Sequence, residues 1–240
     1  MLTSIGPDIW LADGPEVMGA AGFHFPTRMV IVRLPDEAPT PGGGLWVWSP
    51  IAGEAALWAE VDALGPVTTL VAPNALHHMA LPAWAQRYPK ARIYAMPGVG
   101  DTHPNLVGLH DLTQMDADTG TDANTDTGLP HRIYPNAIAP EAVFFHALSG
   151  TVLVTDILQQ MPRGWYRGWR AWVARADLMT GTEPQVPRKF RLATRDKPGA
   201  RATLHWILDQ SPRQVVMAHG TPVTQNAPAF LRRAFRWLRV

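Results

Sequence analysis

The sequence has no cysteine among its 240 residues. The chain therefore forms no disulfide bonds, and any metal ion that it binds must be held by nitrogen and oxygen atoms. Long hydrophobic runs are also missing, since none approaches the roughly 20 apolar residues that span a bilayer, so we expect no integral membrane segment. The N-terminal residues Met1–Asp8 lack a basic region followed by an apolar one, which argues against a signal peptide and favours a cytoplasmic protein.

Net charge is only +1, but the two signs are unevenly distributed along the chain. Residues 1–162 carry 6 basic and 16 acidic side chains, whereas residues 163–240 carry 15 basic and 4 acidic ones. This asymmetry is compatible with an anionic partner, or with two halves of one fold that attract each other. We favour the second interpretation because no nucleic-acid-binding motif is present, and we expect a small-molecule substrate and no nucleic acid.

Local patterns predict one mixed α and β domain over residues 1–240. Short β-branched and aromatic runs separated by turn residues predict an antiparallel meander of strands at 9–12, 28–34 and 45–48. Further strands are predicted at 67–72, 92–96, 142–146, 151–155 and 214–218, the two runs before and after Ser149-Gly150 forming a hairpin. Helices are predicted at 53–64, 81–88, 162–179, 200–209 and 228–238. This order does not fit a Rossmann fold, which needs parallel units throughout and a glycine-rich first turn.

Two segments have an unusual composition. Residues 116–128 contain four aspartates and almost no large apolar group. They resemble a calcium loop, but Thr127 stands where an EF-hand has glutamate, so we predict a flexible surface insertion.

Residues 162–199 are predicted to form a helical, lid-like segment. At helical spacing, Trp165, Trp169 and Trp172 share one face, and three arginines occupy the opposite face. We favour packing of the tryptophans on the core. The alternative is a lid that presents an aromatic or amphipathic surface to a lipid or anionic substrate.

Three β-rich runs each end in, or are followed by, residue types that can bind metal ions. His77 and His78 follow the run 67–72, while Asp156 and His219 end the runs 152–156 and 215–219. Because ligands of α/β sheets bind at the carboxyl ends of strands, we expect these side chains to form one site. Imidazole and carboxylate groups suit Zn, Fe or Mn. We interpret the remaining solitary histidines as structural: His24, His103, His110, His131 and His205.

Four short motifs resemble an uncharacterised branch of the metallo-β-lactamase-like superfamily. They are Trp46-Val-Trp-Ser-Pro50, Ala72-Pro-Asn-Ala-Leu-His-His78, Thr151-Val-Leu-Val-Thr-Asp156 and Ala218-His-Gly220. The resemblance covers most of residues 8–222. It implies an α+β fold, the αββα sandwich of the metallo-β-lactamase type, with a metal site at one sheet edge between the two halves.

The superfamily motif H-x-H-x-D-H fits this chain only in part. With its last two positions on His77 and His78, its first two histidines fall on Pro73 and Ala75, so two ligands of the first metal are missing. In this alignment His77 replaces the aspartate that normally orients the attacking water.

The second-metal ligands of the superfamily have counterparts in this chain. The resemblance implies that His78 and His219 match two histidine ligands and that Asp156 matches the metal-bridging carboxylate. His146 is a further candidate for the middle histidine, although its spacing from Asp156 is short.

We therefore expect one divalent metal ion, Zn or Fe with Mn as a further option, bound by His77, His78, Asp156 and His219, with His146 as an additional candidate. The predicted function is a metal-dependent hydrolase for a small ester, lactone or phosphoester. Asp156 and His77 are the predicted catalytic residues, His77 acting as a ligand or a general base. The alternative is a non-catalytic metal-binding or scaffolding protein that has lost the first-metal ligands; a bound iron would also permit a redox role.

Overall fold

The computed structural model describes residues 1–35, 43–115 and 127–239. The chain forms two compact units. The first comprises Met1–Pro15 and Arg28–Ile133, and the second comprises Glu16–Thr27 and Tyr134–Val240. Across the described ranges, no helix combines the length and the apolar character needed to cross a bilayer.

A seven-stranded sheet follows the chain order from β1 to β7. The strands are β1 (Thr3–Gly6), β2 (Ile9–Met18), β3 (His24–Leu34), β4 (Gly44–Trp48), β5 (Val67–Ala72), β6 (Arg92–Ala95) and β7 (Leu109–Asp111). The pairs β1–β2 and β3–β4 are antiparallel, whereas β4 to β7 are parallel. The antiparallel start predicted from the sequence is confirmed.

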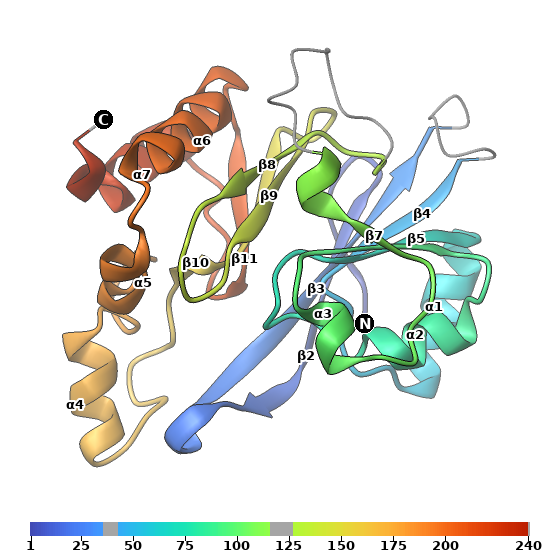
Figure 1. The fold of residues 1–240 in the computed structure, drawn as a ribbon, viewed down its shortest axis with the longest axis horizontal. Coiled ribbons are helices and arrows are strands. Elements are labelled where there is room, and N and C mark those ends of the chain that lie inside the picture. The colour runs from blue at the N-terminus through green and yellow to red at the C-terminus, as the bar shows by residue number, and fades with distance from the viewer. Residues whose placement is uncertain (36–42, 116–126, 240) are drawn as a thin grey trace. The chain divides into compact units, whose positions relative to one another are not determined.

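Helices connect the parallel strands of the first unit. These are α1 (Ala55–Leu64), α2 (Leu81–Arg87) and α3 (Val99–Thr102), which Figure 1 shows grouped near β5 and β7. α1 ends at Gly65, whose φ of 143° is open to glycine and strained for other residues, and Pro66 then prevents continuation. The helices and strands bury one apolar cluster that includes Leu70, Trp84 and Ile93.

The second sheet has four strands in the order β11-β10-β9-β8. They are β8 (His131–Tyr134), β9 (Glu141–His146), β10 (Thr151–Gln159) and β11 (Gln214–His219). β9 and β10 form the predicted hairpin, in which Thr151 pairs with His146 and Gly150 turns the chain with a φ of 66°. β10 and β11 are parallel.

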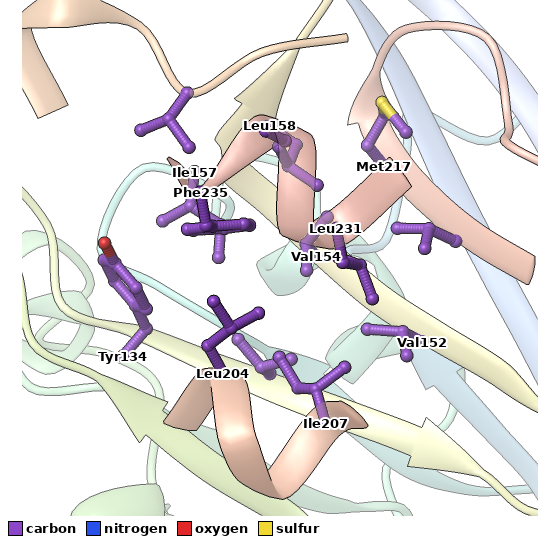
Figure 2. Packing of buried hydrophobic residues seen from close by; sticks show 14 of the residues in the cluster. Tyr134, Val152, Val154, Ile157, Leu158, Leu204, Ile207, Met217, Leu231 and Phe235 are labelled. Atoms are coloured by element: carbon purple, nitrogen blue, oxygen red, sulfur yellow. The ribbon is translucent and has the colours of Figure 1, made fainter. Parts of the chain in front are cut away.

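Four α-helices belong to the second unit: α4 (Trp169–Ala176), α5 (Arg188–Ala193), α6 (Lys197–Asp209) and α7 (Ala227–Ala234). The apolar sides of α6 and α7 contribute Leu204, Ile207 and Leu231 to a cluster with Val152 and Val154 of β10 (Figure 2). This second core holds α6 and α7 against the strands that carry Asp156 and His219.

The helix predicted at 162–179 is wrong in extent. Only Trp169–Ala176 is helical, because Gly164 and Gly168 take φ values of 84° and 58°, outside the helical region. The predicted packing of all three tryptophans on the core is also wrong. Trp165 is partly buried and donates to the carbonyl of His24, but Trp169 and Trp172 are 54% and 73% exposed.

The predicted flexible insertion, 116–128, lies outside the described residues except for its end. Thr127 and Gly128 are described, and Thr127 is buried and donates a hydrogen bond to the Leu129 carbonyl. Gly128 lies against Leu34 with a φ of 92°.

Candidate metal centre

His219 ends β11 in a fixed orientation. Its Nδ1 lies 2.6 Å from the carbonyl oxygen of Pro26, and a carbonyl only accepts, so Nδ1 carries the proton. Nε2 faces the carboxylate of Asp156, 3.4 Å from Oδ1. Both side chains are about 95% buried, and the ring of Phe25 lies 5.4 Å from the His219 ring. A histidine held in this way by a backbone carbonyl is typical of metal ligands, because the bond to one nitrogen leaves the other as the donor to the metal.

Asp156 does not end its strand, as the sequence pattern predicted, but lies within β10. The register between β10 and β11 shifts between Val154 and Gln159, so the strand is irregular where Asp156 lies. Such irregularities redirect side chains and are frequent beside active sites. Gln159 fixes the carboxylate further by donating from Nε2 to Oδ1 at 3.0 Å.

Glu141, which the sequence analysis did not identify, supports this irregular segment. Its fully buried carboxylate accepts hydrogen bonds from three successive backbone amides, those of Thr155, Asp156 and Ile157. Burial, reinforced by the negative charge of Asp156, raises the pKa of Glu141 to about 7. The one sequence signal was a carboxylate at the start of an apolar strand, Glu141-Ala-Val-Phe-Phe-His146.

His77 follows β5 in a turn that Asn74 organises. The side-chain oxygen of Asn74 accepts hydrogen bonds from the backbone amides of Leu76 and His77, at 2.8 and 3.0 Å. Nδ1 of His77 lies 2.8 Å from the hydroxyl of Ser49, which follows β4. Because hydroxyls both donate and accept, this contact is compatible with a proton on Nδ1 of His77.

His78 has a different partner from its neighbour. Its Nδ1 lies 2.7 Å from Nε2 of His103, and the ring centroids are 4.8 Å apart. Burial lowers the pKa of His78, and the nearby imidazoles of His103 and His77 lower it further. His78 is thus one member of a histidine pair, and its lowered pKa favours the neutral form.

His146 lies at the other end of the second sheet from His219. It pairs with Thr151 at the start of β10, whereas Asp156 and His219 lie towards the far end of β10 and at the end of β11. Its Nδ1 contacts the Ser149 hydroxyl at 2.7 Å. The structure therefore brings Asp156 and His219 together and separates His146 from both.

The Asp156–His219 pair fits a cation. Nε2 of His219 and the carboxylate oxygen of Asp156 lie 3.4 Å apart, and a divalent metal ion or a proton between these two atoms would stabilise the pair. The surrounding groups hold both side chains in place, as metal ligands require. The second unit thus contains a candidate His/Asp metal site.

The comparisons with known proteins agree with this architecture. A family model described as "Domain of unknown function (DUF4336)" matches residues 8–170. No curated protein matches the sequence.

Several solved structures share the fold. They include the metallo-β-lactamase FIM-1 from Pseudomonas aeruginosa in its mono-zinc form, with 15% identity, a TM-score of 0.59 and coverage of 99% of this chain and 96% of that one. A metallo-β-lactamase from Hirschia baltica has 11% identity, a TM-score of 0.61 and the same two coverages. One from Pontibacter korlensis has 12% identity and a TM-score of 0.58, covering 100% of this chain and 98% of that one. The two sheets and their helices are therefore of the metallo-β-lactamase type, which confirms the predicted fold class.

Proposed function

The chain belongs to the DUF4336 family, and we propose that it is a metal-dependent hydrolase that acts on a small ester, lactone or phosphoester. The observation that carries the proposal is the Asp156–His219 pair, whose tautomer and orientation are fixed by Pro26 and Gln159. The metallo-β-lactamase fold, of which a zinc-containing example is among the similar structures, supports a hydrolytic role.

We propose that one divalent ion, Zn or Fe with Mn as a further option, is held by His77, Asp156 and His219. His77 and His219 share the feature that supports them as ligands, an oxygen atom within hydrogen-bond distance of Nδ1. We leave His146 out of this ligand set because it lies at the opposite end of the second sheet from Asp156 and His219. We leave His78 out because its imidazole contacts the ring of His103. Three protein ligands leave a position for water or substrate, as catalytic zinc sites do.

The protein residues have separate tasks in this mechanism. A bound divalent cation supplies polarisation of the scissile group and acidification of water. Asp156 and His219 bind it in a buried setting, where electrostatic interactions are stronger than in water. Glu141 positions the backbone of Asp156, and Ser49 orients His77. In this scheme His77 would hold the ion and would not act as the general base.

One observation favours a second candidate, a non-catalytic metal-binding or scaffolding protein. Pro73 and Ala75 occupy the positions where the superfamily motif has its first two histidines, so a two-metal site of the common kind has no ligands there.

We also propose that both compact units form one domain, which is supported by structural matches that run through 97–100% of the chain.

Metal content tests the site. Protein reconstituted separately with Zn, Fe or Mn is expected to hold one ion per chain. The variants His219→Ala and Asp156→Ala are expected to bind much less metal, because removal of one ligand removes most of the affinity. His205→Ala is the matched control, since His205 is an exposed histidine on α6. Absence of stoichiometric metal in the wild type, or equal metal in His219→Ala and the control, refutes the site.

Activity separates the two functions. We expect metal-dependent hydrolysis of at least one of three substrates: 4-nitrophenyl acetate, γ-butyrolactone or bis(4-nitrophenyl) phosphate. Asp156→Ala should abolish this turnover and His205→Ala should retain it. Full metal occupancy without turnover of an ester, a lactone or a phosphodiester refutes the hydrolase and supports the binding protein.

A further inference from the structure

An apolar cavity of about 590 Å³ lies within the second unit. One side is formed by the turn between β2 and β3, with Ala21 and Phe23, and by Phe25 at the start of β3. The end of α4 contributes Val173 and Ala176. Its size falls in the range of about 300–1,000 Å³ that is typical of small-molecule sites. Val173 remains 44% exposed, so the cavity presents apolar surface to water that a ligand would cover.

The charge of the cavity lining is balanced. Asp177 and Lys189 are its two charged residues, and they pair with each other, with Nζ 3.3 Å from Oδ2. Asp177 also accepts a hydrogen bond from the backbone amide of Lys189, which fixes the pair further. A ligand with its own charge would have to compete with this ion pair, whereas a neutral hydrocarbon group would leave it intact.

The cavity and the candidate metal centre share one segment of β3. Phe25 lines the cavity, and its ring lies 5.4 Å from that of His219. The next residue, Pro26, accepts the hydrogen bond that orients His219. A molecule whose apolar part fills the cavity would therefore contact Phe25, the same aromatic ring that packs beside His219.

We propose that this cavity binds a neutral, apolar acyl or alkyl group, and that this group is part of the substrate of the Asp156–His219 centre. The second half of the proposal rests on the proposed hydrolase function and deepens it. It selects esters or lactones that carry a hydrocarbon chain over compact, charged substrates such as phosphodiesters.

Binding is tested without catalysis. The probe is N-phenyl-1-naphthylamine, a neutral fluorophore, displaced by 1-hexanol, 1-octanol or 1-decanol from protein with and without added metal. We expect affinity for the alcohols to rise about fourfold per methylene group until the cavity is full. Octanoate, which carries a charge, should bind more weakly than 1-octanol.

Ala176→Trp fills the cavity from α4 at an exposed position, so it should fold normally. We expect it to weaken 1-octanol binding at least tenfold. Ala202→Trp is the matched control, because Ala202 is an exposed alanine on α6 that does not line the cavity, and it should bind like the wild type. Equal 1-octanol affinity in Ala176→Trp and the control, or a preference for octanoate, overturns the proposal.

Turnover distinguishes failure of the cavity from failure of the proposed function. In metal-loaded protein we expect kcat/KM to rise from 4-nitrophenyl acetate through the butyrate to the octanoate ester, and the rise to disappear in Ala176→Trp. Chain-length-dependent alcohol binding without hydrolysis of any ester, lactone or phosphodiester refutes the hydrolase and leaves the cavity assignment standing. Ester hydrolysis whose kcat/KM does not depend on the length of the acyl chain refutes the cavity as a substrate site and leaves the hydrolase standing.

Discussion

Glu141 offers a direct test of how the candidate centre is built. Its buried carboxylate accepts hydrogen bonds from the amides of Thr155, Asp156 and Ile157, one oxygen serving Thr155 and the other serving the next two. In Glu141→Gln one of these oxygens becomes an NH₂ group, which donates and cannot accept. At least one buried backbone N–H then loses its acceptor, which costs about 1–3 kcal/mol.

This cost converts into a measurable change in melting temperature. For chains of this size a loss of 1 kcal/mol lowers the Tm by roughly 2–4 °C, so we expect Glu141→Gln to melt about 2–12 °C below the wild type. The same change shifts the backbone that carries Asp156, and we expect metal affinity to fall about 10–100-fold. Both measurements are best made at about pH 8, above the raised pKa of about 7, where the carboxylate form prevails.

Glu183→Gln is the matched control. Glu183 pairs with Arg233 at the surface, and both side chains are more than 40% exposed. Loss of such a pair changes stability by less than about 1 kcal/mol. An unchanged Tm in Glu141→Gln, or an equal decrease in Glu183→Gln, would refute the role assigned to Glu141.

Three further predictions concern single side chains. Trp84→Ala should destabilise the protein by about 3–5 kcal/mol in chemical denaturation, because Trp84 is fully buried. Trp172→Ala is its control and should change stability by less than about 0.5 kcal/mol, since Trp172 is 73% exposed. Ser49→Ala should lower metal affinity about 10–100-fold in a chelator competition, because His77 loses the partner of its Nδ1; unchanged affinity would contradict His77 as a ligand. Gly150→Ala should lower the free energy of unfolding by about 1–2 kcal/mol, since residue 150 has a φ of 66°. An unchanged free energy of unfolding would show that the hairpin turn tolerates a Cβ.

Most secondary structure followed from periodicity and turn chemistry. The hairpin at Ser149-Gly150 was predictable because glycine permits the positive φ that the turn uses. The helix predicted at 162–179 was too long because the helical spacing of Trp165, Trp169 and Trp172 does not account for Gly164 and Gly168, whose positive φ values keep residues 164–168 out of the helix. Helical spacing also does not show which face of a helix is buried, and Trp169 and Trp172 are exposed.

The candidate ligands were predictable in part. Position after a strand identified His77 and His219, because the carboxyl ends of parallel strands are where ligands bind. The same rule grouped His78 with them, but adjacent residues in a turn point in different directions, and His78 contacts His103. His146 was assigned by analogy alone, and its strand runs antiparallel to β10, which carries it to the opposite end of the sheet.

The polar residues of β10 could be located from the sequence, but their role could not. All nine residues of this strand are buried, and among them are Thr155, Asp156 and Gln159. A strand buried on both faces normally consists of apolar residues, because each buried polar group needs a partner to offset its loss of hydration. Here the partners come from distant positions in the chain, Glu141 for the backbone and His219 for the carboxylate, and sequence spacing does not reveal such pairs. An arrangement with two buried carboxyl groups, one of them with a raised pKa, is costly for folding alone, and the cation proposed at Asp156 and His219 would offset part of that cost.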